Sequence, residues 1–253
     1  MTGHACAVAQ ASRSAVRWLT CDRAELPDAL DWLAPEESSR LAGLRIAKRR
    51  DDYLLGRWTA KRAIAALLAP ATPLAAIAVR AADDGAPEAF LDGAPLAFTI
   101  SLSHSAGRAL AAVTGAAAGA PLGADLEHIE PRSALLVADF FTADEAAQVA
   151  AQPQDQRDHA ITLIWSAKES ALKARRSGLR EDPRRISVDL GSRRTTPDGA
   201  WRALELAVDG SRGALAGWWR DDASHVLTIV GTAEEVALIE RIRHGTMDAR
   251  ISP

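Results

Sequence analysis

The chain has few cysteines and no long apolar run. Only two cysteines, Cys6 and Cys21, occur among its 253 residues, which is too few for a disulfide framework and predicts a reducing, cytoplasmic setting. No stretch approaches the roughly 20 consecutive apolar residues that a membrane-spanning helix requires, and the first residues lack the apolar centre of a signal peptide. We therefore expect no membrane partner.

An excess of positive charge is also absent, and lysine is scarce. The formal net charge is −3, whereas a protein that binds nucleic acid is usually strongly basic, so we expect no nucleic-acid partner. The 30 basic residues include only four lysines, which are Lys48, Lys61, Lys168 and Lys173. A lysine is a compact point charge, whereas an arginine is a wide planar fork. Two of the four lysines lie in one short segment, which indicates a site that needs the smaller cation.

The apolar residues, 48% of the chain, are enough for one large domain or two modest ones. Helices are predicted over residues 35–68 with a break near Gly43, and over 135–141, 142–149, 156–176 and 234–242. Strands are predicted over residues 97–103, 108–113, 122–129, 186–190, 201–208, 213–219 and 225–230. The small residues at 115–121 predict a boundary between an N-terminal half, 1–119, and a C-terminal half, 120–253. Each half mixes helices with antiparallel strands, which predicts an α+β fold.

Two carboxylates are predicted to project together from the strand that contains GADLE, residues 123–127. Residues i and i+2 of a strand face the same side, which applies to Asp125 and Glu127. Adjacent carboxylates repel, and each tends to hold a proton unless a cation lies between them. Mg²⁺ suits such a pair, because it takes oxygen ligands and leaves positions for substrate phosphates. The alternative is an edge strand whose acids face water.

An acid and a lysine share one face of the helix predicted over residues 156–176. Glu169 and Lys173 are four residues apart and therefore neighbours on that face. The helix begins with apolar residues at 161–164, so we expect it to be substantially buried. A buried acid and lysine need partners, which Asp125 and Glu127 with a metal would supply. The alternative is an ordinary surface ion pair of little energetic value.

Two further segments suit an anionic ligand. The segment SLSHS, residues 101–105, places His104 near a strand end between hydroxyl groups, which would suit a phosphate oxygen; an incidental surface histidine is the alternative. Residues 40–62 contain eight basic residues and two acids, which favours a binding site for a highly anionic ligand. The alternative for this segment is a solvated helix face.

In their order along the chain these motifs resemble the surfactin-synthetase-activating type of 4′-phosphopantetheinyl transferase. SLSHS is similar to the first motif of that family, and GADLE followed by Arg132 is similar to its Gly-x-Asp-x-Glu motif. WSAKESALKA, residues 165–174, is similar to its Trp-x-x-Lys-Glu-x-x-x-Lys signature, and KRRDDYLLGRWTAKRAI, residues 48–64, resembles its arginine-bearing N-terminal helix. Order and spacing agree over about residues 35–190.

The resemblance implies a magnesium-dependent enzyme that transfers 4′-phosphopantetheine from coenzyme A to a serine of an acyl or peptidyl carrier protein, with release of 3′,5′-ADP. It implies a monomer of two similar α+β halves, a pseudo-dimer, with coenzyme A in the cleft between them. The carrier proteins of fatty-acid, polyketide and peptide synthesis are all compatible with it. We place the docking surface for the carrier at Phe140, Phe141 and the surrounding region of residues 133–150, with packing of the two phenylalanines in the core as the alternative.

The resemblance also implies roles for particular residues. The expected Mg²⁺ ligands are Asp125, Glu127 and Glu169, and the expected catalytic residues are Glu169, Lys173 and His104. The expected contacts to coenzyme A are Arg49, Arg57, Ser103, His104, Lys168 and Lys173, with Arg40 as a further candidate. Members of the family often have a Gly-Lys-Pro turn before the first motif, where the lysine helps to bind coenzyme A. Here the turn reads Gly85-Ala86-Pro87, which lacks that lysine, and the alternative is that an arginine elsewhere supplies the contact.

Three other functions are compatible with the same residues. A metal-dependent phosphotransferase or phosphohydrolase for nucleotides would use the same acids but would need no carrier protein. A non-catalytic module that binds coenzyme A or a carrier would have no need of the proton acceptor that Glu169 offers. A nucleic-acid-binding protein would use residues 40–62, and its binding would be weak and sensitive to salt.

Overall fold

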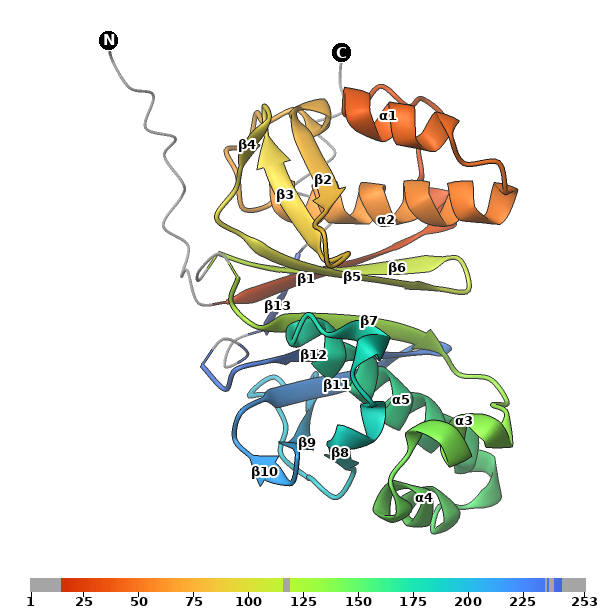
Figure 1. The fold of residues 1–253 in the computed structure, drawn as a ribbon. Coiled ribbons are helices and arrows are strands. Elements are labelled where there is room, and N and C mark those ends of the chain that lie inside the picture. Colours follow the sequence, from red (N-terminus) through yellow and green to blue (C-terminus); the bar gives the residue numbers. More distant parts are fainter. Residues whose placement is uncertain (1–14, 116–118, 235, 237–238, 243–253) are drawn as a thin grey trace.

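A computed structural model of the protein describes residues 15–115, 119–234, 236 and 239–242. Two β-sheets lie face to face, and a long helix covers the outer face of each sheet (Figure 1). This mixed helix-and-sheet architecture confirms the predicted α+β class. Within these residues, no helix is long and apolar enough to cross a membrane.

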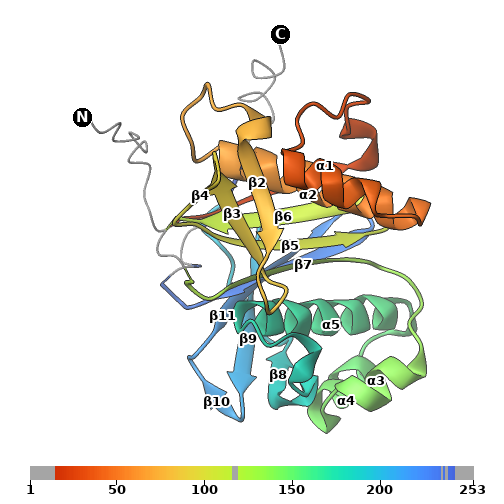
Figure 2. The same cartoon turned by 45° about the horizontal axis from the view of Figure 1, so that its top comes forward.

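The first sheet lies in the N-terminal half and has the strand order β13-β1-β6-β5. These strands are β13 (Ile239–Arg241), β1 (Val16–Asp22), β6 (Arg108–Thr114) and β5 (Thr99–Ser105). The helices of this half are α1 (Pro35–Ala42) and α2 (Ala47–Ala65), and the break between them confirms the predicted interruption near Gly43. A small sheet beside α2 consists of β2 (Ile77–Ala81), β3 (Pro87–Leu91) and β4 (Ala94–Pro95), and its β2–β3 turn points toward the second half (Figure 2).

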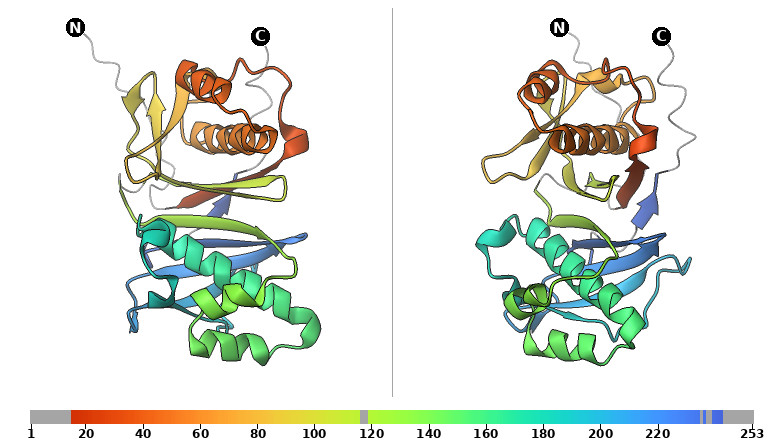
Figure 3. Two further views of the ribbon diagram at one scale, coloured as in Figure 1. Left: turned by 45° about the vertical axis from the view of Figure 1, so that its right-hand side comes forward. Right: turned by 90° about the vertical axis from the view of Figure 1, so that its right-hand side faces the viewer.

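The second sheet has the strand order β10-β9-β11-β12-β7, and β8 pairs with β9. These strands are β7 (Leu122–His128), β8 (Ile186–Asp189), β9 (Arg202–Val208), β10 (Ser211–Arg212), β11 (Ala216–Asp222) and β12 (His225–Gly231). Its helices are α3 (Ala134–Phe140), α4 (Ala143–Ala150) and α5 (Arg157–Ala174). Helix α5 covers the outer face of β7 and β12 (Figure 3). Each half thus combines one large sheet with one long helix, and the first half adds the small sheet of β2, β3 and β4.

Alternation along the strands explains how both faces of each sheet are buried. In β1, Val16 and Trp18 lie in an apolar core between the two sheets, whereas Leu19 and Cys21 pack in the core against α2. The second sheet contributes to the same inter-sheet core through Leu122, Ala124, Leu126, Leu227 and Ile229. Because side chains alternate, the other face of β7 presents residues 123, 125 and 127 to α5.

Helix α5 approaches β7 most closely at Gly123. A Cβ atom built at Gly123 would lie 1.7 Å from the carbonyl oxygen of Ser170 and 2.7 Å from the amide nitrogen of Ala174. Both are backbone atoms, so they cannot move without displacing the helix. The glycine therefore sets the depth at which α5 packs on the two carboxylates of β7.

We expect Gly123→Ala to lower the free energy of unfolding by about 1–3 kcal/mol, because the added methyl group overpacks the contact with α5. Urea unfolding followed by circular dichroism measures the change. The matched control is Gly56→Ala in α2, where an added Cβ meets no atom within 4 Å and alanine favours the helix. An unchanged urea midpoint for Gly123→Ala would contradict the packing argument.

The C-terminal segment differs from the prediction. A helix was expected over residues 234–242, but Ile239–Arg241 form strand β13, parallel to β1, and Ile242 joins the core of the first half. Residues 235 and 237–238 of the expected helix, and 116–118 of the expected linker, lie outside the described residues. Residues 239–241 therefore return to the first sheet, and the division at 119/120 stays a prediction.

Candidate active site

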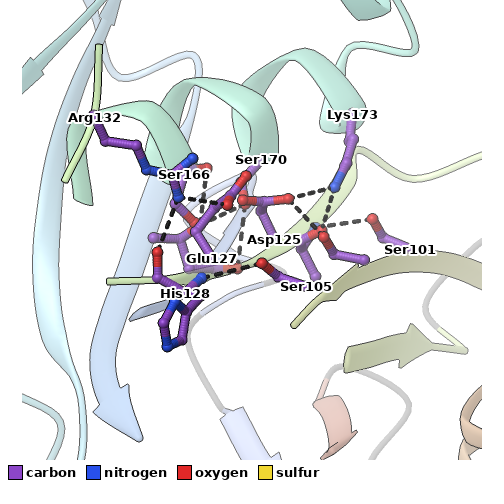
Figure 4. A network of polar contacts seen from close by, with 12 residues as sticks. Ser101, Ser105, Asp125, Glu127, His128, Arg132, Ser166, Ser170 and Lys173 are labelled. Carbon is purple, nitrogen blue, oxygen red and sulfur yellow. Dashed lines mark hydrogen bonds and ion pairs between the residues drawn. The ribbon is translucent and has the colours of Figure 1, made fainter. Parts of the chain in front are cut away.

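The carboxylates of β7 lie beneath α5, where the helix supplies a cation. Asp125 is only 3% exposed, and its Oδ1 accepts a hydrogen bond from Nζ of Lys173 at 2.6 Å. Lys173 also donates to the carbonyl oxygen of Ala124 at 3.2 Å (Figure 4). The acid and the lysine, each singled out by its spacing in the sequence, are thus in direct contact.

The serines of the SLSHS segment join the two halves at this point. Ser101 Oγ accepts a hydrogen bond from the amide of Ala124 at 2.8 Å, and Ser105 Oγ accepts one from the amide of His128 at 3.2 Å (Figure 4). Between them, Ser103 Oγ donates to Oδ1 of Asp125 at 2.7 Å. Alternate side chains of β5 therefore bridge to β7, although the backbones of these strands do not pair. By the same alternation His104 lies on the opposite face of β5, where it is exposed.

The pKa values of two acids of the site, Glu127 and Glu169, are raised by burial and by the nearby charge of Asp125. Burial raises the pKa of Glu127, and the charge of Asp125 raises it further, while Arg132 opposes both through a hydrogen bond of 2.8 Å. Burial also raises the pKa of Glu169, again with Asp125 adding to the effect and with Lys173 opposing it. Three carboxylates therefore share a site in which their negative charges repel one another.

The donor set suits a divalent cation. Oδ2 of Asp125 is buried and has no hydrogen-bond partner, which leaves one hard oxygen ligand free. Among the described residues, no three acids, histidines or cysteines already stand in a metal-binding arrangement. Lys173 and Arg132 instead neutralise Asp125 and Glu127. Mg²⁺ ligation by Asp125, Glu127 and Glu169 stays a prediction that the chemistry of the donors supports.

A cavity of about 420 Å³ opens beside this cluster, between the two halves. Its walls come from the β2–β3 turn, β3, β5 and the end of α5. Lys173 and Ser101 line one side, and apolar side chains including Phe90 and Phe98 line another. A ligand with an apolar or aromatic body and an anionic end would match this lining.

Residues 121–215 match the sequence model of the 4′-phosphopantetheinyl transferase superfamily. The match covers less than half of the chain, and over this segment the chain resembles that superfamily. It contains Asp125, Glu127, Glu169 and Lys173, whereas the serines of β5 and the whole of α2 lie outside it. The match agrees with the predicted resemblance over residues 121–215, the segment that supplies the acidic cluster.

Two curated relatives and one solved structure show similarity to the chain. It is 34% identical over 82 residues to the 4′-phosphopantetheinyl transferase psf-1 of Bacillus pumilus, which is 32% of this chain and 34% of that protein. It is 32% identical over 123 residues to the L-aminoadipate-semialdehyde dehydrogenase-phosphopantetheinyl transferase of Eremothecium gossypii, 46% of this chain and 44% of that protein. The matches thus span less than half of either relative. A holo-(acyl-carrier-protein) synthase of Bacillus anthracis, solved with CoA (3′,5′-ADP), gives a TM-score of 0.34 and 22% identity over 40% of this chain and 93% of that one.

The segment of α5 that resembles the phosphopantetheinyl transferase signature contains Lys168, which does not line the cavity. Lys168, an expected contact to coenzyme A, is fully buried, and its Nζ lies 2.9 Å from the carboxylate of Glu145. It also donates to the carbonyl oxygens of Pro183 and Ile186. Every one of these partners is in the second half, away from the cavity. The ammonium group of Lys168 therefore ties α5 to α4 and to the start of β8 in this structure, and its contact to coenzyme A stays a prediction that its burial disfavours.

The basic residues of α2 are also removed from the cavity, whose lining includes none of them among the described residues. Arg57 lies over the ring of Tyr53, 4.7 Å from its centroid, and its Nε is 3.7 Å from the carboxylate of Glu37. Arg49 and Arg40 are exposed. Contacts from these arginines to coenzyme A therefore stay predictions.

Sequence reasoning missed three charged residues that line the cavity, Arg176, Asp84 and Glu88. Arg176 follows α5, and its guanidinium makes a bidentate ion pair with Asp84 of the β2–β3 turn, with distances of 2.7 and 2.9 Å. The signal was present in the sequence, because Arg176 lies three residues after Lys173. Nothing local connected it to a turn 92 residues earlier in the chain.

Proposed function

We propose that the chain transfers the 4′-phosphopantetheine group of coenzyme A to a serine hydroxyl of an acyl or peptidyl carrier protein and releases 3′,5′-ADP. The observation that carries the proposal is the contact of Lys173 with Asp125, beside Glu127 and Glu169, at the edge of a cavity between the halves. These four residues lie in the segment that matches the superfamily. The similarity to psf-1 favours the surfactin-synthetase-activating type.

The reaction requires attack of the serine oxygen on the β-phosphorus of coenzyme A and departure of the ADP oxygen. Positioning and charge neutralisation carry most of such a transfer. Asp125, Glu127 and Glu169 would hold Mg²⁺, which when bound would neutralise negative charge on the pyrophosphate. Lys173 binds oxygens of the transferred phosphate, and Ser103 keeps Asp125 oriented. Glu169 accepts the proton of the attacking serine, directly or through a water molecule.

The two phenylalanines of the expected docking surface pack inside the second half of the protein. Phe141 is 5% exposed and belongs to the core of the second half, and Phe140 packs against Trp165 with ring centroids 5.3 Å apart. Their expected role as an exposed docking pair is wrong, because both rings are used in packing.

The proposal is tested by mixing the purified chain with coenzyme A, Mg²⁺ and an apo carrier protein, and then measuring the intact mass of the carrier. We expect a gain of one phosphopantetheine group, which disappears when EDTA removes the metal. Carriers from fatty-acid, polyketide and peptide synthesis should be compared in parallel, because the proposed reaction is compatible with all three.

Two outcomes would contradict the proposal in favour of its alternatives. Release of phosphate from nucleotides without a carrier would indicate a different nucleotide phosphotransferase or phosphohydrolase. Tight binding of coenzyme A with no change in the mass of any carrier would indicate a non-catalytic binding module.

A further inference from the structure

The mouth of the cavity carries a cation that no motif marks. Four charged residues line the cavity, namely the cations Lys173 and Arg176 and the acids Asp84 and Glu88. Lys173 contacts Asp125 of the acidic cluster. Arg176 lies about one helical turn further along, at the end of α5. The two cations thus occupy successive positions along one wall.

The partner of Arg176 comes from the other half of the protein. Asp84 accepts two hydrogen bonds from the Arg176 guanidinium, at 2.7 and 2.9 Å, across the cavity mouth. The arginine holds the pKa of Asp84 at about 2, so this carboxylate is charged at every physiological pH. Oδ1 of Asp84 also accepts a hydrogen bond from the amide of Ala86 at 3.1 Å, which fixes the turn. The turn and the end of α5 are thereby held together.

The ion pair is well oriented but accessible. The side chains of Arg176 and Asp84 are 43% and 30% exposed, and exposed ion pairs add little net stability. The backbone of Arg176 has φ of +55°, a region that non-glycine residues rarely adopt, so the guanidinium is directed by a specific local conformation. A phosphate group offers the same fork of oxygens as a carboxylate with more negative charge. It is therefore a strong competitor for Arg176.

We propose that Arg176 binds a phosphate group of coenzyme A at the cavity mouth, and that Asp84 holds the guanidinium in position until the ligand displaces it. The inference rests on the proposed function. The turn at residues 85–87 has alanine at its centre and supplies no cation. Ala86 and Arg176 line the same cavity, so Arg176, which follows α5, supplies the positive charge instead of the turn.

The test is isothermal titration of the full chain with coenzyme A and with 3′-dephospho-coenzyme A. Arg176→Gln should raise the Kd for coenzyme A about tenfold, which is the loss of one charge-assisted contact. Asp84→Asn should lower the Kd several-fold, because it removes the nearer competing charge, leaves only Glu88 at 3.8 Å from the guanidinium, and keeps the acceptor for the Ala86 amide. The double variant should bind like Arg176→Gln alone.

The two ligands identify the phosphate. A loss of affinity in Arg176→Gln that vanishes with the dephospho compound assigns Arg176 to the 3′-phosphate, and a loss that persists assigns it to the pyrophosphate. The matched controls are Arg185→Gln and Asp209→Asn, which break a bidentate pair with distances of 2.7 and 2.6 Å outside the cavity. Both controls should bind like the wild type.

Wild-type affinity of Arg176→Gln for both ligands, or weaker binding by Asp84→Asn, would overturn this inference and leave the proposed function intact. A wild-type chain that binds no coenzyme A at all would instead refute the proposed function and this inference together. The two failures are therefore distinguishable in one set of titrations.

Discussion

Replacement of Glu169 by glutamine is expected to reduce phosphopantetheine transfer by about 10²–10⁴-fold, the usual contribution of a general base. Glutamine keeps the shape of the side chain but cannot accept the proton of the attacking serine. Its neutral amide also removes one of the three charges that crowd around Asp125 and Glu127, so the fold should not suffer. The measurement is the rate at which apo carrier protein gains mass, together with the Kd for coenzyme A.

The control for Glu169→Gln is Glu130→Gln. Glu130 lies near the same cluster, with its carboxylate 3.9 Å from Arg132, but its side chain is 55% exposed and it has no role in the proposed reaction. Glu130→Gln should transfer phosphopantetheine at the wild-type rate, and both variants should still bind coenzyme A. Wild-type turnover by Glu169→Gln would remove this residue from the mechanism.

Local periodicity was sufficient to predict which acids and which lysine share a face of their strand or helix in the acidic cluster. The i, i+2 spacing of Asp125 and Glu127 and the i, i+4 spacing of Glu169 and Lys173 each depend on one strand or one helix. The strand and the helix were both predicted within a few residues of their observed bounds. Their contact follows because Gly123 lets α5 settle directly on β7.

The basic segment at residues 40–62 shows why a run of charges alone does not identify a ligand site. Three of its eight cations, Arg57, Lys61 and Arg62, pair with acids from other parts of the chain. Lys61 forms a buried pair with Glu37, and Arg62 lies 3.1 Å from Glu25. These acids are 24 and 37 residues away in the sequence, so the composition of the segment itself could not reveal them.

The last strand illustrates a similar limit on local reasoning. Residues 234–242 have a helical pattern, yet Ile239–Arg241 add to the edge of the first sheet through parallel pairing with β1. The choice between helix and strand there depends on a free sheet edge more than 200 residues earlier in the sequence. Tertiary pairing of this kind overrides intrinsic propensity.

Lys168→Met is expected to lower the free energy of unfolding by about 3–5 kcal/mol, because it leaves the buried carboxylate of Glu145 without its cation. Glu145 is fully buried, and it also accepts hydrogen bonds from the amides of Thr142 and Val188, so it cannot turn toward solvent. Burial lowers the pKa of Lys168 and Glu145 opposes that shift, as expected for a lysine held by its partner. Urea unfolding measures the loss of stability.

The double variant Lys168→Met/Glu145→Gln should recover part of this loss, since it removes both charges and keeps an acceptor near the Thr142 amide. Lys48→Met is the control for removal of a lysine from an exposed ion pair, because the Lys48 side chain is 82% exposed beside Asp52. The free energy of unfolding of this variant should hardly change. Folded Lys168→Met should bind coenzyme A with the wild-type Kd. If stability were instead unchanged and the Kd for coenzyme A rose, Lys168 would be a contact to coenzyme A, as the sequence first indicated, and its buried position would have to change when the ligand binds.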